Sequence, residues 1–402
     1  MEKIRLIIGV LLLSLGLALA GCWDSVELEE RGMVTSLGID KYSYTRARAE
    51  AGDDAIIPED ISRNRYTVTF SLPSADFIKE DLGKANIIYS TVGESLYNTS
   101  RLLTTRINSQ VYFGHLSTIV LGETIVQDEH LFREILDVIE RDALISRRVN
   151  LVISACPAQD VLKVESNLTP VTGDFIKMLF QNKERSSRSG IADMGSILKE
   201  LHNSGNTVIP RITARESDLN IAGSAVIKNY QLEGWLGEIE TRAIEIMKGR
   251  TKTVGYSVHY GEEDVEDTGA YAHDFHVVSI NSIFVPRKFD LVQDSPMELV
   301  IRVGVRGKIE QFYLDPHQDL LDRKIINRVE EKLARRITEE LEAVIDKLQK
   351  EYRVDVIGLG DYINKYHHDL WQNIEEDWTN IFPSIVIKVD TDVKIRRIGM
   401  IR

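Results

Sequence analysis

The chain has 402 residues, 28% of which are charged, and its formal net charge is −13. At ~100–200 residues per domain, this length predicts two or three domains. The acidic balance disfavours a nucleic-acid partner, because phosphates would be repelled. Cys22 and Cys156 are the only cysteines. They provide no disulfide framework, and a chain of this size can bury a sizeable core without one.

The N-terminus has the pattern of an export signal. Lys3 and Arg5 precede an uncharged apolar run over residues 6–20. About fifteen residues of helix span ~22 Å at 1.5 Å per residue, which is short of the ~30 Å hydrocarbon core of a bilayer. The charged start, the short apolar body and the small residues at its end predict a secretory signal peptide over residues 1–21.

The apolar run ends in Leu19-Ala20-Gly21-Cys22, which resembles a bacterial lipobox. In that motif the cysteine thiol takes a diacylglyceryl group, and cleavage before it leaves a lipidated N-terminus. We predict that Cys22 is the lipidation site, since an acidic chain would not reach an anionic lipid surface by charge and acyl chains must hold it there. The alternative is an ordinary signal peptide with a chance cysteine. It is disfavoured because all four residues fall in register.

Strand and helix patterns alternate in the first half of the mature chain. Residues 65–72 alternate apolar and polar side chains, as a half-buried strand does. Residues 128–148 predict a helix that begins after Asp128 as its cap and repeats apolar residues every four positions. The other expected elements are a helix over 94–107 and strands over 115–122 and 149–155. The alternation predicts a mixed α/β domain.

Two polar stretches interrupt this half. Residues 42–64 are irregular in pattern and predict a long surface loop. Residues 180–215 carry charge, Ser and Gly, and predict a linker or surface excursion. We therefore place the N-terminal mixed α/β domain over residues 22–215, with that linker as its last part.

The second half, residues 216–402, begins with short strand patterns between Gly-rich and charged turns. We expect a β-rich part over 216–290, including mostly strand over 231–249, and an α/β part over 291–402. The acidic stretch 261–269 is interpreted as a solvated loop. Its carboxylates lack the alternate spacing around a glycine bend that a calcium loop requires.

The clearest predicted element is a long amphipathic helix over residues 319–352, which contain neither Gly nor Pro. Its apolar residues recur every three or four positions: Ile326, Val329, Leu333, Ile337, Leu341, Val344 and Leu348. This stripe favours packing across a sheet over a coiled-coil arm. A closing strand over 383–401 is expected to be buried on both faces. The predicted fold class is α+β, a multi-domain chain of several mixed sheets with a long helix near the C-terminus.

Motifs for chemistry are missing from the sequence. It has no P-loop, no GxSxG, no paired CxxC and no HExxH. His367 and His368 are adjacent, so on a helix they point about 100° apart and cannot chelate one ion together. His115 fits a turn, and the arginines within 141–148 suit a helix end without requiring an anion. We predict no catalytic, cofactor-binding or metal-binding residue and no enzyme activity.

The stretch GCWDSVELEERGMVTSLGIDK, residues 21–41, resembles the mature start of the Ger(x)C family of spore germination lipoproteins. The matching residues are Cys22, Trp23, Asp24, Glu27, Gly38, Ile39 and Asp40. Further segments resemble the family in order along nearly the whole chain: residues 113–123, 139–154, 222–244, 351–366 and 393–401, with Trp371 and Trp378. This order and coverage make the resemblance specific. Residues 42–64 depart from the family pattern by their length and charge, so no role is carried onto them.

The resemblance implies the C subunit of a GerA-type nutrient germinant receptor of endospore-forming bacteria. Such a subunit would lie on the outer face of the cytoplasmic membrane, which is the inner membrane of the spore, and its N-terminal lipid would anchor it. The implied partners are integral-membrane A-type and B-type subunits, in a complex that senses small nutrients. The implied fold consists of several mixed α/β domains. We expect the soluble part to be monomeric.

The favoured hypothesis is docking to these membrane subunits, without catalysis, metal or cofactor. The expected docking surfaces are the β-rich middle and the exposed side of the long helix, whose charges include Glu330, Glu331, Arg335 and Arg336. Candidate anchors are Trp235, Trp371 and Trp378, although each is more readily explained as a core residue. The alternative is a lipid-anchored solute-binding protein that delivers a small nutrient to a membrane transporter. It is disfavoured because the chain lacks two similar lobes of repeated βαβ units. A surface hydrolase would need a nucleophile or metal constellation, which the sequence does not show.

Overall fold

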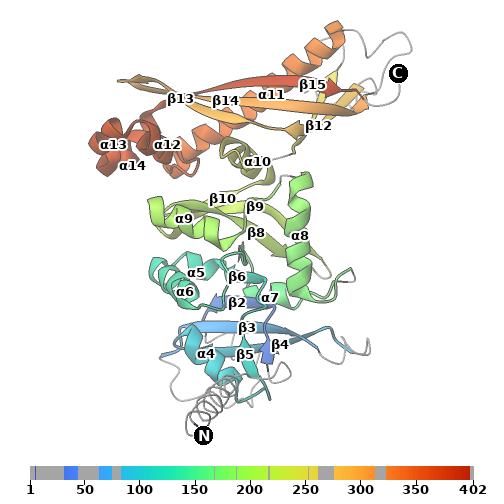
Figure 1. The fold of residues 1–402 in the computed structure, drawn as a ribbon, viewed down its shortest axis with the longest axis vertical. Helices are drawn as coiled ribbons and strands as arrows, with labels where there is room; N and C mark the ends of the chain where they lie inside the picture. Colours follow the sequence, from blue (N-terminus) through green and yellow to red (C-terminus); the bar gives the residue numbers. More distant parts are fainter. Residues whose placement is uncertain are drawn as a thin grey trace.

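The computed structural model describes residues 5, 31–43, 63–74, 83–166, 168–186, 188–215, 218–251, 253–260, 276–312 and 323–398. Apart from residue 5, the predicted signal peptide lies outside these residues, as do Cys22, most of the 42–64 stretch and the acidic stretch 261–269. The described part is elongated, and its two main β-sheets follow one another along the long axis (Figure 1). We call the one nearer the N-terminus the large sheet and the other the small sheet.

The large sheet has eight strands among the described residues, in the order β10-β9-β8-β7-β6-β2-β3-β4. Its central pairs, β2 with β6, β6 with β7 and β7 with β8, are parallel, and the flanking pairs are antiparallel. The strands are β2 (Ser36–Lys41), β3 (Tyr66–Pro73), β4 (Asn86–Gly93), β6 (Thr118–Gly122), β7 (Asn150–Ser154), β8 (Thr207–Ala214), β9 (Leu219–Lys228) and β10 (Gln231–Leu236). A separate parallel pair is formed by β1 (Arg31–Met33) and β5 (Gln110–Tyr112).

Helices cover both faces of the large sheet. Successive residues of a strand point to opposite faces, and Ile119 and Val120 of β6 accordingly belong to two different buried clusters. The cluster on the Ile119 side includes α4 (Leu96–Leu103), α5 (Glu123–Val126), α6 (Glu129–Arg141) and α9 (Met194–Ser204). The cluster on the Val120 side includes α7 (Ala158–Leu162) and α8 (Thr172–Ser186). The predicted alternation of strand and helix in this half is confirmed, including Asp128 as the cap of α6.

The expected linker over residues 180–215 is wrong. The range holds the end of α8, all of α9 and strand β8 in the large sheet. Helix α9 has both end signals: Asp193 accepts a hydrogen bond from the Ser196 N–H, and Gly205 follows in a left-handed conformation with φ of 73°. The large sheet also continues past residue 216, because β9 pairs with β8.

The small sheet is built around the 16-residue strand β14 (Met297–Phe312). On one side of β14, β13 (Arg287–Asp294) pairs with its first part and β12 (His276–Phe284) with its last part, both antiparallel. Strand β11 (Gly255–Tyr260) pairs with β12 and extends the sheet. On the other side, β15 (Val386–Arg397) runs parallel to β14. A parallel pair needs a crossover, and the long helix α11 (Arg323–Lys347) lies within that crossover.

The predicted amphipathic helix is confirmed, and it packs across the small sheet. All seven apolar residues of the predicted stripe are buried, and Leu333, Ile337 and Leu341 are completely inaccessible to solvent. The helix ends in one π-helical turn over Leu348–Tyr352. Shorter helices follow at the end of the small sheet: α12 (Leu359–Tyr366), α13 (His368–Ile374) and α14 (Trp378–Ile381). The α+β class, with several mixed sheets and a long helix near the C-terminus, is therefore confirmed.

Two predictions for this half are wrong. Residues 231–249 contain only one strand, β10, which is followed by α10 (Glu238–Met247). Strand β15 is not buried on both faces: it alternates between exposed and partly buried residues over most of its length. In the described part it pairs with β14 alone, so it is an edge strand, and α11 covers only one of its faces.

Helix α10 lies between the two sheets and joins them into one core (Figure 1). One buried cluster contains Val208, Val226 and Leu236 of the large sheet together with residues of α10, α11 and the small sheet. At one end of this joint, Glu200 of α9 forms ion pairs with Lys248, at 2.7 Å, and with Arg250, both of which follow α10. Burial would raise the pKa of Glu200, but these two cations hold it below its ordinary value.

We predict that Glu330 fastens α11 to the edge strand β15. Its buried carboxylate accepts a 2.8 Å hydrogen bond from the Ile395 N–H and lies 3.2 Å from Lys394 Nζ. Changing Glu330 to Ala should lower the free energy of unfolding by about 2 kcal/mol, since the partly buried Ile395 N–H loses its acceptor. Chemical denaturation measures this. Glu331→Ala, at an exposed neighbour, should change stability by less than ~0.5 kcal/mol, and an equal loss in both variants would contradict the prediction.

Candidate docking site

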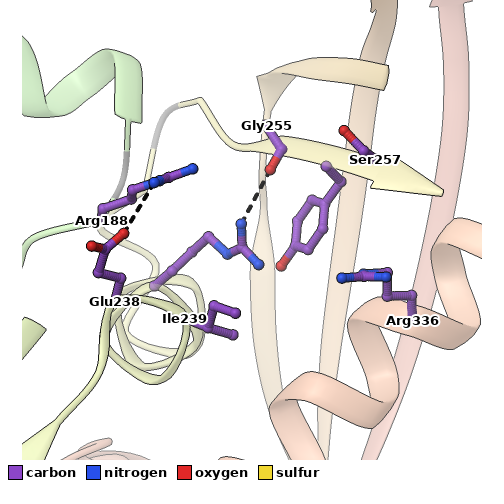
Figure 2. A pocket seen from close by; sticks show the side chains of 8 residues that line it. Arg188, Glu238, Ile239, Gly255, Ser257 and Arg336 are labelled. Atoms are coloured by element: carbon purple, nitrogen blue, oxygen red, sulfur yellow. Dashed lines mark hydrogen bonds and ion pairs between the residues drawn. The ribbon is translucent and has the colours of Figure 1, made fainter. Parts of the chain in front are cut away.

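A groove runs between α10 and α11, where β11 also approaches. It consists of two adjoining hollows of about 300 Å³ and 380 Å³ that share Ile239 and Arg336. Figure 2 shows Arg336 extending from α11 toward the strand that carries Gly255 and Ser257, and Arg188 beside Glu238 on the opposite side. We call this the α10–α11 groove.

The floor of the groove is a buried ion pair. The Arg242 guanidinium donates two hydrogen bonds to the Glu340 carboxylate, at 3.0 Å and 2.6 Å, and one to the Gly255 carbonyl at 3.2 Å. Their side chains are only 13% and 8% exposed. The guanidinium also lies 4.2 Å from the centre of the Tyr256 ring. Burial would lower the pKa of Arg242, but the bonds to Glu340 raise it above its ordinary value, so the pair stays charged.

Tyr256 completes this floor. Its hydroxyl donates to Glu340 Oε1 at 3.2 Å. Burial raises the pKa of Tyr256 far above its ordinary value, and the Glu340 carboxylate raises it further. The phenol is therefore a fixed neutral donor. A floor in which every polar group is already paired positions the helices and does not offer an acid or base for catalysis.

The rim of the groove is polar and exposed, and an apolar side chain lies between its charged residues. Arg188 Nη1 lies 3.0 Å from Glu238 Oε2, and these side chains are 65% and 38% exposed. Arg336 and Glu339 are exposed on α11. Ile239 is 55% exposed between the two helices. An apolar centre within a charged rim is the arrangement of a protein–protein contact, in which a few anchors carry most of the binding energy.

Local sequence explains how α10 presents Ile239. The helix begins after Gly237, and the Glu240 carboxylate turns back to accept a 2.6 Å hydrogen bond from the Gly237 N–H. Glu240 also pairs with Lys347 of α11 at 2.8 Å. The opposite side of α10 is buried in the joint, so Ile239 is directed away from the core.

Four charged residues were predicted to lie on the docking side of the long helix, and the structure exposes only three of them. Glu331, Arg335 and Arg336 are exposed, and Arg336 lines the groove. Glu330 is 5% exposed, so placing it on the docking surface is wrong. The physical reason is its bond to the backbone of the edge strand β15, which compensates a buried charge.

The three candidate tryptophans are partly buried in contacts within the chain. The Trp235 indole N–H donates to Glu123 Oε1 at 3.2 Å, and its carbonyl accepts from the Tyr352 hydroxyl at 2.9 Å. Trp371 and Trp378 pack edge to face with ring centres 5.4 Å apart. None of them lines the α10–α11 groove. Their interpretation as core residues fits these contacts better than a role as anchors.

The remaining candidates lie in ordinary local contacts. His368 Nδ1 is 3.1 Å from Asn364 Oδ1, and His115 is exposed. Arg141 pairs with Asp137, one turn earlier, at 2.7 Å. Cys156 Sγ lies 3.1 Å from Ser154 Oγ. Within the described ranges, no group of three or more His, Cys, Asp and Glu side chains is placed to hold a metal ion, and no helix is long and apolar enough to span a membrane.

Several groove residues were not predicted from the sequence. Arg188, Arg242 and Ile239 come from a segment predicted as linker and a segment predicted as strand. They meet Arg336 and Glu340 only because α10 packs beside α11. The one local signal was the capping pattern Gly-x-x-Glu over residues 237–240, which marks a helix start.

Three described residues from segments that resemble the family, Gly38, Asp40 and Asp355, have roles in the fold. Asp40 accepts hydrogen bonds from the first two N–H groups of α7, those of Ala158 at 2.9 Å and Gln159 at 3.2 Å. Gly38 lets β2 approach the same helix, because a Cβ there would lie 3.1 Å from Leu162. Asp355 accepts from the Gly360 N–H at 2.8 Å and from the Trp378 indole at 3.3 Å.

Two family models match the chain one after the other. "Spore germination protein N-terminal domain" matches residues 24–214, and "Spore germination B3/ GerAC like, C-terminal" matches residues 222–399. The chain belongs to the Ger(x)C family of spore germination proteins. Membership of the Ger(x)C family supports a role in spore germination. The point where one family model ends and the other begins falls in the connection between β8 and β9, within the large sheet.

Relatives in Bacillus subtilis (strain 168) match over nearly their whole length. Spore germination protein YndF is 24% identical over 98% of this chain and 96% of its own. Spore germination protein A3 is 24% identical over 95% of each chain. The crystal structure of the GerBC protein aligns with a TM-score of 0.54 at 19% identity, over 85% of this chain and 96% of its own. The chain therefore has the same overall fold as a solved Ger(x)C protein.

We predict that the two arginines of the groove differ in what they do for stability. Arg242→Ala would leave the buried Glu340 carboxylate without its cation, so the free energy of unfolding should fall by about 3 kcal/mol. Arg188→Ala removes an exposed ion pair and should lower it by less than ~1 kcal/mol. Urea denaturation followed by circular dichroism compares them. Similar losses in the two variants would mean that the Arg242–Glu340 pair does not hold the groove.

Proposed function

We propose that the chain is the lipid-anchored C subunit of a spore nutrient germinant receptor. In this proposal Cys22 carries the lipid, the protein lies on the outer face of the inner spore membrane, and it docks to the integral-membrane A-type and B-type subunits. It acts without catalysis. The observation that carries the docking role is the α10–α11 groove, with Ile239 exposed between charged rims in a chain that matches the Ger(x)C family from residue 24 to residue 399.

A short tether supports docking at the membrane. The first described strand begins at Arg31, nine residues after Cys22. Nine extended residues reach at most ~30 Å. A lipid on Cys22 would thus keep the fold close to the bilayer and raise its effective concentration at membrane partners.

The alternative of a solute-binding protein is less well supported. Such proteins close two similar lobes around a ligand. The two sheets of the described part differ, since the large sheet has a parallel centre and the small sheet is mainly antiparallel. The joint between them is also filled by α10 and a continuous core, which opposes hinge closure.

We predict that reversing one charge in the groove disrupts docking. Arg336→Glu adds a negative charge to a groove that already holds Glu339 at the rim and Glu340 in the floor, and Ile239→Glu puts a charge at the apolar centre. Each should weaken recovery of the A-type and B-type subunits with the tagged chain by about tenfold or more, ~1.4 kcal/mol. The measurement is affinity purification from solubilised spore membranes, together with the nutrient response of the same spores.

The matched control is Arg335→Glu, which makes the same charge change at the adjacent position of α11, outside the groove. It should behave as the unmodified protein. The thermal stability and abundance of all three variants must be equal for the comparison to count. If stable Arg336→Glu and Ile239→Glu proteins still co-purify with both subunits and support germination, docking does not use this groove.

We also predict that Cys22→Ala loses its membrane anchor. The thioether needs the cysteine sulfur, and no described helix offers a second span. In spores that lack the A-type and B-type subunits, fractionation should move the variant from the membrane pellet to the supernatant or leave an uncleaved precursor. A processed Cys22→Ala protein that stays wholly in the pellet would contradict lipidation at this residue.

A further inference from the structure

A second hollow, of about 410 Å³, opens where α9 faces α12. Its walls come from both sides of the joint between the sheets: Lys199 and Glu200 from α9, Arg287 and Phe289 from β13, and residues of α12, α13 and α14. We call it the joint cavity. It shares no lining residue with the α10–α11 groove.

The cations on the inner wall of the joint cavity differ in whether a carboxylate pairs with them. Lys248 and Arg250 both pair with Glu200. Arg287 donates from Nη2 to the Lys248 carbonyl at 3.1 Å and lies 3.9 Å from the centre of the Phe289 ring. Among the described residues it has no carboxylate partner, and its buried Nε–H has no acceptor. Burial lowers the pKa of Arg287, and neighbouring Arg250 lowers it further, as expected for a cation without a counter-ion.

The facing wall is aromatic. It is formed by Phe289, Tyr362, Tyr366, Trp371 and Trp378. Phe289 and Tyr362 pack edge to face with ring centres 5.5 Å apart. The buried indole N–H of Trp371 also has no acceptor among the described residues. Buried donors of this kind are normally paired, and this cavity has two of them in its lining.

We propose that the joint cavity binds a small monocarboxylate with a flat apolar body. The carboxylate would pair with the Arg287 guanidinium, and the body would lie against the aromatic wall. Bonding to the Arg287 Nε–H and the Trp371 indole requires a small shift of those side chains, because both atoms are shut off from solvent.

The carboxylates in the lining favour this class over a multiply charged anion. Glu200, Asp355 and Asp361 all face the cavity. Burial raises the pKa of Asp361, and the nearby Asp355 and Glu200 raise it further, against a hydrogen bond with Asn203 and the charge of Lys199. A multiply charged anion that filled the cavity would contact Asp355 and Asp361, whereas one carboxylate needs only the Arg287 guanidinium. The bound molecule would touch α9 and α12 together and so stiffen the joint.

Isothermal titration calorimetry of the full chain in detergent tests the proposal, with phenylacetate as the probe. We expect one-to-one binding of phenylacetate and at least about tenfold weaker binding of acetate, of benzyl alcohol and of inorganic phosphate. Arg287→Gln should weaken phenylacetate binding by about tenfold or more, and Trp371→Phe by about threefold or more. The matched control Arg141→Gln, on α6 and outside the lining of the cavity, should bind as the unmodified chain.

Several outcomes would overturn the site. They are no saturable phenylacetate binding, phosphate binding as tight as phenylacetate, or unchanged affinity in both cavity variants. Thermal melting identifies an unfolded Arg287→Gln variant, and in that case two other variants decide. Trp371→Phe must weaken the binding of phenylacetate. Arg287→Lys must weaken it less than Trp371→Phe does. The site does not depend on docking, so Ile239→Glu should bind phenylacetate normally even where it no longer recovers the membrane subunits.

Discussion

The fold depends on a joint in which buried charges and a buried helix connect two unlike sheets. Glu200 on α9 pairs with Lys248 and Arg250 after α10, and the Lys248 side chain is only 7% exposed. Beside it, the Lys228 ammonium donates to the Tyr352 carbonyl at 3.0 Å. A buried ion pair is strongly destabilised when one partner leaves. The two sheets are therefore expected to separate only when the whole joint opens.

Both candidate sites lie along this joint. The α10–α11 groove opens between the helix that fills the joint and the helix that crosses the small sheet, and the joint cavity opens between α9 and α12. The joint cavity draws its lining from both matched regions of the chain, whereas the groove takes only Arg188 from the first of them. The two regions are also joined within one sheet, because β8 of the first region pairs with β9, most of which belongs to the second.

Sequence patterns predicted elements whose burial follows a simple period. The seven-residue stripe of the long helix was found because every member is buried at a regular spacing. Helices α9 and α10 were missed because their caps stand in charged or strand-like surroundings, and the buried face of α10 is set by the joint. Strand β15 was misjudged because its apolar and polar residues do not alternate cleanly, which suggested burial on both faces, whereas it is an edge strand that α11 covers on one face. The same limit applies to the site: Asp40 and Asp355 could be picked out because they belong to segments that resemble the family, while the groove residues meet only through tertiary packing.

The most direct test of the docking account is hydrogen exchange, measured by mass spectrometry on the chain alone and in complex with the A-type and B-type subunits. Amide protection follows the burial and stabilisation of hydrogen-bonded segments. We predict slower exchange in the complex over residues 237–247 and 335–344, with little change in α4 and β4 at the far end of the large sheet. Slower exchange confined to that far end, with residues 237–247 and 335–344 unchanged, would contradict docking through the α10–α11 groove.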